Sequence, residues 1–386
     1  MTRVVIASDK FKGTLTAAEV AAHLSAGILE VRPDVEVSVV PVSDGGDGLL
    51  EAAARCGFET VPVTASGPTG QPVRTRFARR GPEAAIEMAE VCGLLRLPGG
   101  ELAPATASSR GLGEVVATAL DAGCTSVLLG VGGSASTDGG AGLVSALGAA
   151  VRDRTGVQVP DGGAGLEQAV ALDLTGLHPA LPDATLTVAC DVDNPLTGPT
   201  GAAAVYGPQK GADAGLVARL DAALEHWADL VERVTGKDLR NHPGAGAAGG
   251  VGYGAMAVLG ARLRPGTEVV QEMTGLAEAV AHSDLVITGE GSLDAQTLHG
   301  KAPAGVADAA RRAGVPVVAV AGRCLLDAAA LGGAGIGSVY TLVAEATSPA
   351  QTFEAPGVLL RQIGRRVAVE HLSGAVPARP SAGARE

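Results

Sequence analysis

The stretch GVGGSASTDGGAG, residues 130–142, follows the apolar run TSVLL and stands where a β-strand would pass into a helix. Glycines at such a position let the backbone approach a ligand, and the free N–H groups that open a helix attract anions. Ser134, Ser136 and Thr137 add hydroxyl donors, and Asp138 is placed either to cap the helix or to hold a metal ion. An ordinary glycine-rich turn fits the same residues, so the rest of the chain has to separate the two interpretations.

Short β-rich runs alternate with helical stretches at both ends of the chain. They include RVVIAS near the start and DLVITG, VPVVAVAG and SVYTLVA later. This rhythm predicts a parallel sheet with helices on both faces. Between residues 58 and 89, apolar and polar residues alternate around S-G-P-T-G and R-G-P turns, which indicates an antiparallel ribbon and a second domain of another type.

We therefore expect an α/β protein with two different α/β domains, one of them inserted into the other. A chain of 386 residues is long enough for two or three domains of roughly 150 residues. The parallel-sheet domain is predicted to be discontinuous and to comprise residues 1–57, about 106–140 and about 266–373. The inserted mixed-sheet domain is predicted at about 58–105 and about 141–265, and the Pro-, Ala- and Gly-rich residues 374–386 are predicted to form a disordered tail.

Composition narrows the possible partners. A net charge of −12 argues against nucleic acid and against anionic membranes, because both need a basic face. No uninterrupted apolar run approaches the roughly 18 residues of a membrane span. The five cysteines are scattered and form no C-x-x-C pair, which predicts reduced thiols and a cytoplasmic protein. We expect a monomer or homodimer that acts on a small molecule.

The positions of the charged residues indicate an enzyme that transfers a phosphoryl group. No P-loop motif occurs, and the one G-x-G-x-x-G (GAGAAG, residues 244–249) does not follow a strand, which disfavours a dinucleotide-binding fold. Four of the five lysines lie in glycine-bearing turns, where each is a candidate point charge for phosphate or carboxylate. Acidic residues recur where strands should end. This combination suggests Mg²⁺-assisted phosphoryl transfer, and the residues concerned are Lys10, Lys12, Lys210, Lys301, Asp9, Asp44, Asp47, Asp191, Glu290 and Asp294.

Seven segments, in order along the chain, resemble motifs of the bacterial-type glycerate kinase family. They are VVIASDKFKGTLTAAEV, PVSDGGDG, SGPTGQPV, GVGGSASTDGGAG, ACDVDNPLTGPTGAAAVYGPQKGA, GAGAAGG and DLVITGEGSLDAQTLHGKAPAGVA. The resemblance implies ATP-dependent phosphorylation of D-glycerate, with 2-phosphoglycerate favoured over 3-phosphoglycerate. It also implies a flavodoxin-like domain joined to one that resembles a restriction endonuclease, with the active site in the cleft between them. The chain departs from the usual motifs at Ser8, Lys10, Asp47 and Asp193.

Site residues follow from the needs of the reaction, which are in-line positioning, positive charge at the phosphoryl group and an acid near the attacking hydroxyl. Asp191 is our first choice for base or metal ligand, and Lys12 and Asp294 complete the catalytic set. Substrate-binding candidates are Lys10, Asp44, Gly45, Gly46, Asn194 and Lys210. Candidates for ATP binding are Gly132, Gly133, Ser134, Thr137, Asp138, Glu290 and Lys301, with Mg²⁺ assigned to Asp138 and Asp191.

Two other classes of function stay open on the residues alone. A dehydrogenase of a small hydroxy acid would use a nicotinamide cofactor and would not turn over a nucleotide. A non-enzymatic metabolite sensor would bind its ligand without consuming ATP.

Overall fold

The structure, a computed structural model, describes residues 1–11, 13–42, 48–298 and 302–372. The chain divides into a first unit, built from residues 1–42 and the segment from residue 274 onward, and a second unit, residues 43–273. The second unit is a single insertion into the first. The expectation of two different α/β folds, one inserted in the other, is confirmed.

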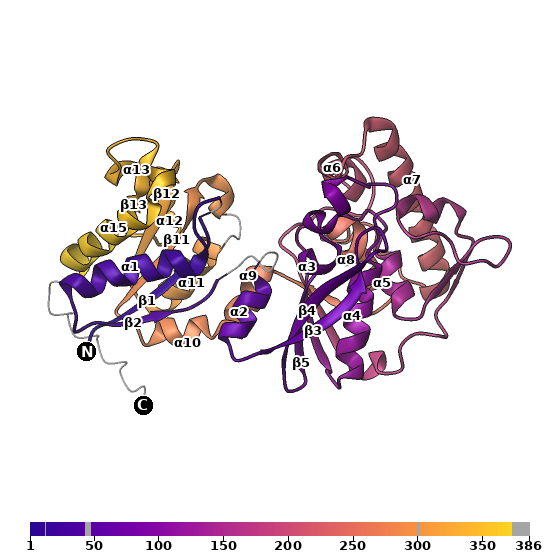
Figure 1. Cartoon of the computed structure of the whole chain (residues 1–386), viewed down its shortest axis with the longest axis horizontal. Coiled ribbons are helices and arrows are strands. Elements are labelled where there is room, and N and C mark those ends of the chain that lie inside the picture. The colour runs from indigo at the N-terminus through magenta and orange to yellow at the C-terminus, as the bar shows by residue number, and fades with distance from the viewer. Residues whose placement is uncertain (12, 43–47, 299–301, 373–386) are drawn as a thin grey trace, which may run out of the picture. The chain divides into compact units, whose positions relative to one another are not determined.

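The first unit is built on a parallel sheet with the strand order β13-β12-β11-β1-β2. Read from β2, this is the 2-1-3-4-5 order of flavodoxin-like sheets. The indigo strands β1 and β2 lie beside the orange strand β11, so the two ends of the chain close one sheet (Figure 1). The strands are β1 (Arg3–Ser8), β2 (Glu36–Val39), β11 (Leu285–Leu293), β12 (Val317–Cys324) and β13 (Ser338–Thr341).

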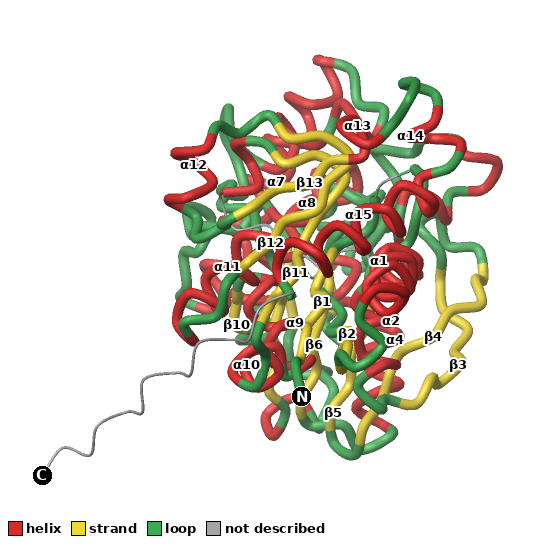
Figure 2. Tube along the Cα trace, turned by 90° about the vertical axis from the view of Figure 1, so that its left-hand side faces the viewer, coloured by secondary structure: helices red, strands yellow, loops and turns green. Residues whose placement is uncertain are grey.

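Alternation along β1 sends side chains to two apolar layers of the first unit. Val4 and Ile6 pack with helices α1 and α15, whereas Val5 and Ala7 pack with α10 and α11. Figure 2 shows α1 and α15 side by side over the strands. Helix α1 begins with the predicted capping box, in which Thr16 and Glu19 satisfy each other's backbone N–H groups. The helices are α1 (Ala17–Val31), α10 (Leu276–Ala281), η6 (Ala295–Leu298), α11 (Ala302–Ala313), α12 (Ala328–Gly333), α13 (Leu342–Glu345), α14 (Gln351–Glu354) and α15 (Pro356–His371).

The second unit is built on a mixed sheet with the order β10-β9-β6-β5-β4-β3. Strands β3, β4 and β5 are antiparallel neighbours and form the ribbon predicted from the sequence, while β5, β6, β9 and β10 pair in parallel. The strands are β3 (Glu59–Ser66), β4 (Pro72–Arg80), β5 (Glu83–Glu87), β6 (Ser126–Gly130), β9 (Thr185–Ala189) and β10 (Arg262–Arg264), with a separate hairpin of β7 (Ala150–Arg152) and β8 (Ala171–Asp173).

Helices cover both faces of this sheet, and a further apolar cluster surrounds the fully buried Trp227. Helix α4 packs on one face and α2 with α9 on the other, whereas α5, α7 and α8 enclose Trp227. The helices are α2 (Leu49–Arg55), α3 (Ala89–Cys92), α4 (Arg110–Asp121), α5 (Ala141–Ala146), α6 (Ala202–Tyr206), α7 (Ala214–Thr235), α8 (Ala247–Ala257) and α9 (Gly266–Thr274), with short 3₁₀ helices η1 (Leu94–Arg96), η2 (Pro98–Gly100), η3 (Gly163–Gln168), η4 (Leu181–Asp183) and η5 (Pro208–Lys210).

The predicted domain boundaries need correction in three places. Strand β6 lies between β5 and β9, so residues 106–140 belong to the second unit and not to the parallel sheet of the first. Helices α2 and α9 bury Leu49 and Val270 against the same mixed sheet, which moves their segments as well. A βα rhythm looks alike in both sheets, because strand pairing is set by contacts between distant segments. The predicted tail, residues 374–386, lies outside the described residues.

In the described part of the chain, no helix combines the length and the apolar character that crossing a bilayer requires. Cys56, Cys92, Cys124, Cys190 and Cys324 are all free thiols, as predicted.

We expect Gly111→Ala to destabilise the second unit by about 1–3 kcal/mol, the usual cost of overpacking. A Cβ at Gly111 would lie 1.8 Å from the carbonyl oxygen of Ser66. Gly215→Ala is the matched control, because Gly215 is also helical and its Cβ would meet nothing closer than 3.4 Å. Trp227 is the single tryptophan and belongs to this unit, so its fluorescence during urea unfolding reports both variants. Equal midpoints for the two would contradict the packing described.

Candidate functional site

A cavity of about 220 Å³ lies in the second unit at the carboxyl ends of the parallel strands β6 and β9. Ligands of open α/β sheets bind at this edge, because loops from neighbouring strands converge there. Its walls come from the start of η1, from the loops after β6 and β9, from the α6–η5 segment and from the start of α8. They are formed by Leu94, Val131, Gly132, Gly133, Ser134, Ala189, Cys190, Asp191, Val192, Tyr206, Gln209, Lys210, Ala247 and Ala248. Five predicted site residues, Gly132, Gly133, Ser134, Asp191 and Lys210, are therefore brought together.

Lys210 gives this cavity its chemical character. Its side chain is 2% exposed, and its Nζ donates to Ser134 Oγ at 2.9 Å and to the carbonyl oxygen of Ser136 at 2.5 Å. Burial lowers the pKa of Lys210 to about 7, although the nearby charge of Asp138 acts in the opposite direction. The described residues accept from the ammonium at two points, while an ammonium has three N–H donors. Such a group can bind an anionic ligand atom.

The glycine-rich loop, residues 131–140, has two parts with different surroundings. Its first part lines the cavity, where Gly133 accepts from the Leu94 N–H at 2.9 Å. Its second part is packed against α8: the Gly139 N–H donates to Gly249 at 2.9 Å, and a Cβ at Gly249 would lie 2.0 Å from the carbonyl oxygen of Ser136. The loop therefore serves both as a cavity wall and as a packing surface.

Backbone strain accompanies this contact. Ala248, Gly249 and Gly250 all have positive φ at the start of α8, and Ala248 is the one non-glycine residue with positive φ in the part of the chain that the structure describes. Such a conformation persists only where the surroundings enforce it, and it is common at ligand sites. Ala248 also lines the cavity, so the strain occurs where a ligand would bind.

Asp138 does not have the surroundings of a metal ligand, although the sequence suggested that role. Its carboxylate is 0% exposed and does not line the cavity. One oxygen accepts from the Ser109 N–H at 2.8 Å and from Ser109 Oγ at 2.9 Å, with longer contacts to Ser108 Oγ and the Gly142 N–H, and the other accepts from the Gly140 N–H at 3.2 Å. Burial raises the pKa of Asp138, and these donors oppose that shift. The carboxylate is used within the protein to tie the loop to the start of α4.

Thr137, which we assigned to ATP binding, is likewise 0% exposed and does not line the cavity. Its Oγ1 and the Oγ of Ser136 are buried without a hydrogen-bond partner among the described residues. Buried hydroxyl groups are nearly always paired, so an ordered water is the simplest partner for each.

The loop after β9 places Asp191 and Asn194 differently. Asp191 is exposed at the cavity wall, and its Oδ1 accepts from the Gly266 N–H at 2.8 Å. Asn194 does not line the cavity. Its amide oxygen accepts from the Tyr206 hydroxyl at 2.6 Å and its Nδ2 donates to Thr200 at 2.8 Å, so it positions Tyr206, which does line the cavity.

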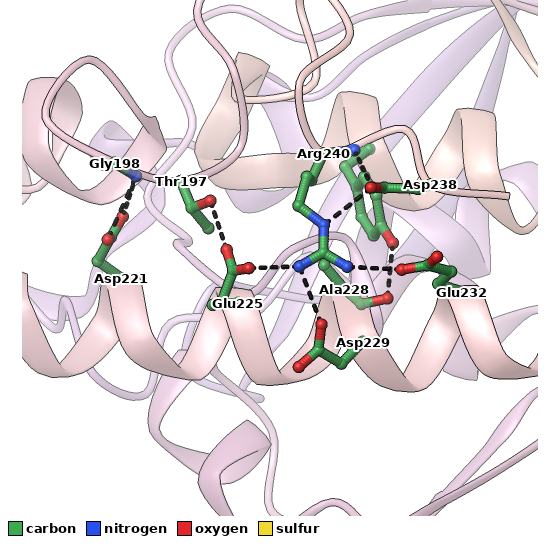
Figure 3. Close-up of polar contacts among 10 residues, drawn as sticks. Thr197, Gly198, Asp221, Glu225, Ala228, Asp229, Glu232, Asp238 and Arg240 are labelled. Atoms are coloured by element: carbon green, nitrogen blue, oxygen red, sulfur yellow. Dashed lines mark hydrogen bonds and ion pairs between the residues drawn. The ribbon is translucent and has the colours of Figure 1, made fainter.

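Carboxylates on α7 and just after it hold the loop that follows β9 in place through Arg240. The guanidinium of Arg240 contacts Glu225, Asp229, Glu232 and Asp238 (Figure 3). The backbone carbonyl oxygen of Arg240 accepts from the Leu196 N–H at 2.8 Å. In the same loop, the Gly198 N–H donates to Asp221 and the Thr197 hydroxyl donates to Glu225, and both carboxylates belong to α7. A planar guanidinium offers five donors, which suits it to join several carboxylates.

The remaining predicted site residues belong to the first unit or are not described. Lys10 follows β1, Glu290 lies on the neighbouring strand β11, and Asp294 follows β11, so they share the carboxyl edge of the parallel sheet. Glu290 is 9% exposed and accepts from the Thr297 hydroxyl, while the Asp294 N–H donates to Thr297 Oγ1 at 3.0 Å. Lys12, Asp44, Gly45, Gly46 and Lys301 lie outside the described residues.

Sequence reasoning missed Tyr206, Gln209 and Ala248 as cavity residues. Tyr206 and Gln209 stand within the segment VYGPQKGA that carries Lys210, so proximity to a glycine-flanked lysine was an available signal. Ala248 gave none, because its strained conformation depends on contacts with residues far along the chain.

Comparisons with known proteins agree on one family. The model of the glycerate kinase family matches residues 4–371. A glycerate kinase of Bacillus subtilis is 40% identical over 95% of this chain and 97% of its own length, and a glycerate 2-kinase of Escherichia coli is 42% identical over 88% and 90%. The crystal structure of a proposed glycerate kinase 2 from Salmonella typhimurium LT2 has a TM-score of 0.84 and 40% identity, covering 95% of this chain and 97% of that one.

We expect Asp138→Asn to lower the free energy of unfolding by about 1–3 kcal/mol, the cost of leaving buried donors without an acceptor. The carboxamide replaces one of two accepting oxygens with an NH₂ group that faces N–H donors. Asp121→Asn is the control, because the Asp121 side chain is 75% exposed and pairs with His178 at the surface, where such pairs contribute about 1 kcal/mol or less. Urea unfolding followed by Trp227 fluorescence measures both. A parent-like midpoint for Asp138→Asn would restore the ligand interpretation.

Proposed function

The chain belongs to the glycerate kinase family, and from this membership we propose that it transfers the γ-phosphoryl group of ATP to D-glycerate. The name of the Escherichia coli relative, a glycerate 2-kinase, supports 2-phosphoglycerate as the product. The observation that carries the proposal is the buried ammonium of Lys210 in a cavity of about 220 Å³. That volume suits a three-carbon acid, and the charge suits its carboxylate.

Lys210 and Ser134 form the carboxylate site in this proposal. Ser134 Oγ accepts from Lys210 Nζ at 2.9 Å, so its own hydroxyl proton is available to a ligand oxygen. Tyr206 and Gln209 line the same cavity and can contact the hydroxyl groups of glycerate. Because Gly132 and Gly133 are also wall residues, we assign them to the acid substrate and the transferred phosphoryl group instead of the nucleotide base.

Asp191 is the residue of this cavity best placed to orient the attacking hydroxyl group or to hold Mg²⁺. It is exposed to the cavity, whereas Asp138 is enclosed. In the described ranges, no three His, Cys, Asp or Glu side chains are grouped closely enough to hold a metal ion by themselves. Mg²⁺ in kinases commonly takes one or two carboxylates together with phosphate oxygens and water, and it would neutralise charge on the transferred group.

Incubation of the purified chain with D-glycerate, ATP and Mg²⁺ is expected to give ADP and 2-phosphoglycerate. Proton and phosphorus NMR of the product distinguish the 2- from the 3-phosphate, and excess chelator should abolish turnover. Consumption of a nicotinamide cofactor would indicate the dehydrogenase instead. Glycerate binding without turnover would indicate the sensor.

Lys210→Met is expected to raise KM for D-glycerate by at least about 30-fold, since loss of a buried charge partner costs about 2 kcal/mol or more. In the parent, log kcat/KM for D-glycerate should fall above pH 7, because the neutral amine of a lysine with a pKa of about 7 no longer attracts a carboxylate. The variant should lose this dependence on pH.

The control for Lys210→Met is Lys237→Met, an exposed lysine of the same unit, which should keep parent kinetics. Trp227 fluorescence shows whether each variant is folded. A folded Lys210→Met with the KM and the pH profile of the parent would rule out the proposed carboxylate site.

A further inference from the structure

A second cavity, of about 580 Å³, lies wholly within the first unit. Its walls come from the turn after β1, from the ends of β11 and β12, and from the segment that runs from α13 to α14. The lining residues are Phe11, Thr14, Gly291, Gly322, Arg323, Leu342, Val343, Ala346, Thr347, Ser348, Pro349, Thr352 and Phe353. None of them was predicted as a site residue.

The position of this cavity in the sheet is that of a ligand site. Strand β1 pairs with β2 on one side and with β11 on the other, so the direction in which the chain adds strands reverses at β1 and β11. In flavodoxin-like sheets, ligands bind beyond the carboxyl ends of the strands at this point. Phe11 and Thr14 follow the end of β1, and Gly291 lies near the end of β11.

The lining suits a nucleoside with attached phosphates. Two of the four phenylalanines of the chain line this cavity, which is notable in a protein with so few aromatic residues. Phe353 is 74% exposed and Val343 60%, so apolar surface stands open to solvent beside the cavity. Aromatic faces stack on bases. The Thr347 hydroxyl donates to Gln351 Oε1 at 3.1 Å, and its oxygen can still accept from a ribose hydroxyl group. Arg323 supplies positive charge, and its Nε donates to Ser292 Oγ at 3.1 Å.

The cavity of the first unit has a larger volume than the cavity at Lys210. The proposed reaction needs one site for a three-carbon acid and one for a nucleotide. The 220 Å³ cavity has room for the acid, whereas 580 Å³ falls in the range of about 300–1,000 Å³ that larger ligands occupy. Resting on the proposed function, we infer that the first-unit cavity binds the base and ribose of ATP, with Phe353 as a stacking surface for the base. This replaces the assignment of the nucleotide to the loop at residues 130–142.

Phe353→Ala tests the inference by calorimetry with ADP as the probe. Because the ring is largely exposed, its removal should leave the fold intact. Loss of one stacking surface should raise Kd for ADP by about tenfold or more, and KM for ATP with it, while KM for D-glycerate stays unchanged. Tripolyphosphate has no base, so its Kd should not change. Phe353→Tyr keeps the ring and should behave as the parent.

A second variant and a control complete the design. Val343→Glu places a negative charge at the cavity wall and should weaken both ADP and tripolyphosphate. Val358→Glu is its control, because Val358 is 55% exposed on α15 and does not line the cavity.

The outcomes distinguish this inference from the proposed function. ADP binding that is equal in the parent, Phe353→Ala and Val343→Glu would overturn the inference and leave the kinase proposal standing. A parent that phosphorylates D-glycerate yet does not bind ADP would also overturn it. ADP binding that depends on Phe353, in a chain that never phosphorylates D-glycerate, would support the cavity and overturn the proposed function alone.

Discussion

A lysine ammonium enclosed by protein is the constraint around which the second unit is arranged. Moving an ammonium out of water costs several kcal/mol unless hydrogen bonds and opposite charge offset that cost. Lys210 receives both: Ser134 Oγ and the Ser136 carbonyl oxygen accept from Nζ, and the charge of Asp138 favours the protonated form. These partners come from the loop after β6, more than 70 residues away in sequence. The loop must therefore reach η5 closely enough for hydrogen bonding.

Close backbone contact makes that approach possible. Gly249 and Gly250 pack on residues 136–139, where a Cβ would overlap the Ser136 carbonyl oxygen or the Gly139 Cα. Trp227 Nε1 donates to the Gly139 carbonyl oxygen at 3.0 Å and fixes the same loop from the side of α7. The glycine-rich loop GVGGSASTDGGAG therefore has two parts with different surroundings. Gly132 to Ser134 form a cavity wall, and residues 136–140 are a packing surface that positions this wall.

Features of the fold that depend on residues close in sequence could be predicted, whereas features that depend on contacts between distant segments could not. The capping box at Thr16 and the ribbon at residues 58–89 depend on neighbouring residues, and both predictions hold. Lys210 was singled out because a lysine beside glycine is unusual in a chain rich in Arg.

The sheet to which β6 belongs was predicted wrongly, because its partners, β5 and β9, are chosen by tertiary packing. The burial of Asp138 could not be predicted, since a carboxylate that ties two loops together and one that holds a metal ion look alike in sequence. Phe11 and Phe353 were predicted to belong to one domain, but the sequence does not show that their two loops line the same cavity.

The lowered pKa of Lys210 affects both the stability of the folded chain and the binding of an anion at this site. The pKa is about 7 in the folded chain and 10.5 at its ordinary value, so between these pH values the unfolded chain holds a proton that the folded chain has released. Stability from this group therefore rises with pH over that window, and below pH 7 the full cost of the buried charge is present. An anion bound beside Nζ favours the charged form, so its binding above pH 7 takes up a proton. The buried charge that destabilises the folded chain is thus the same charge that attracts a carboxylate.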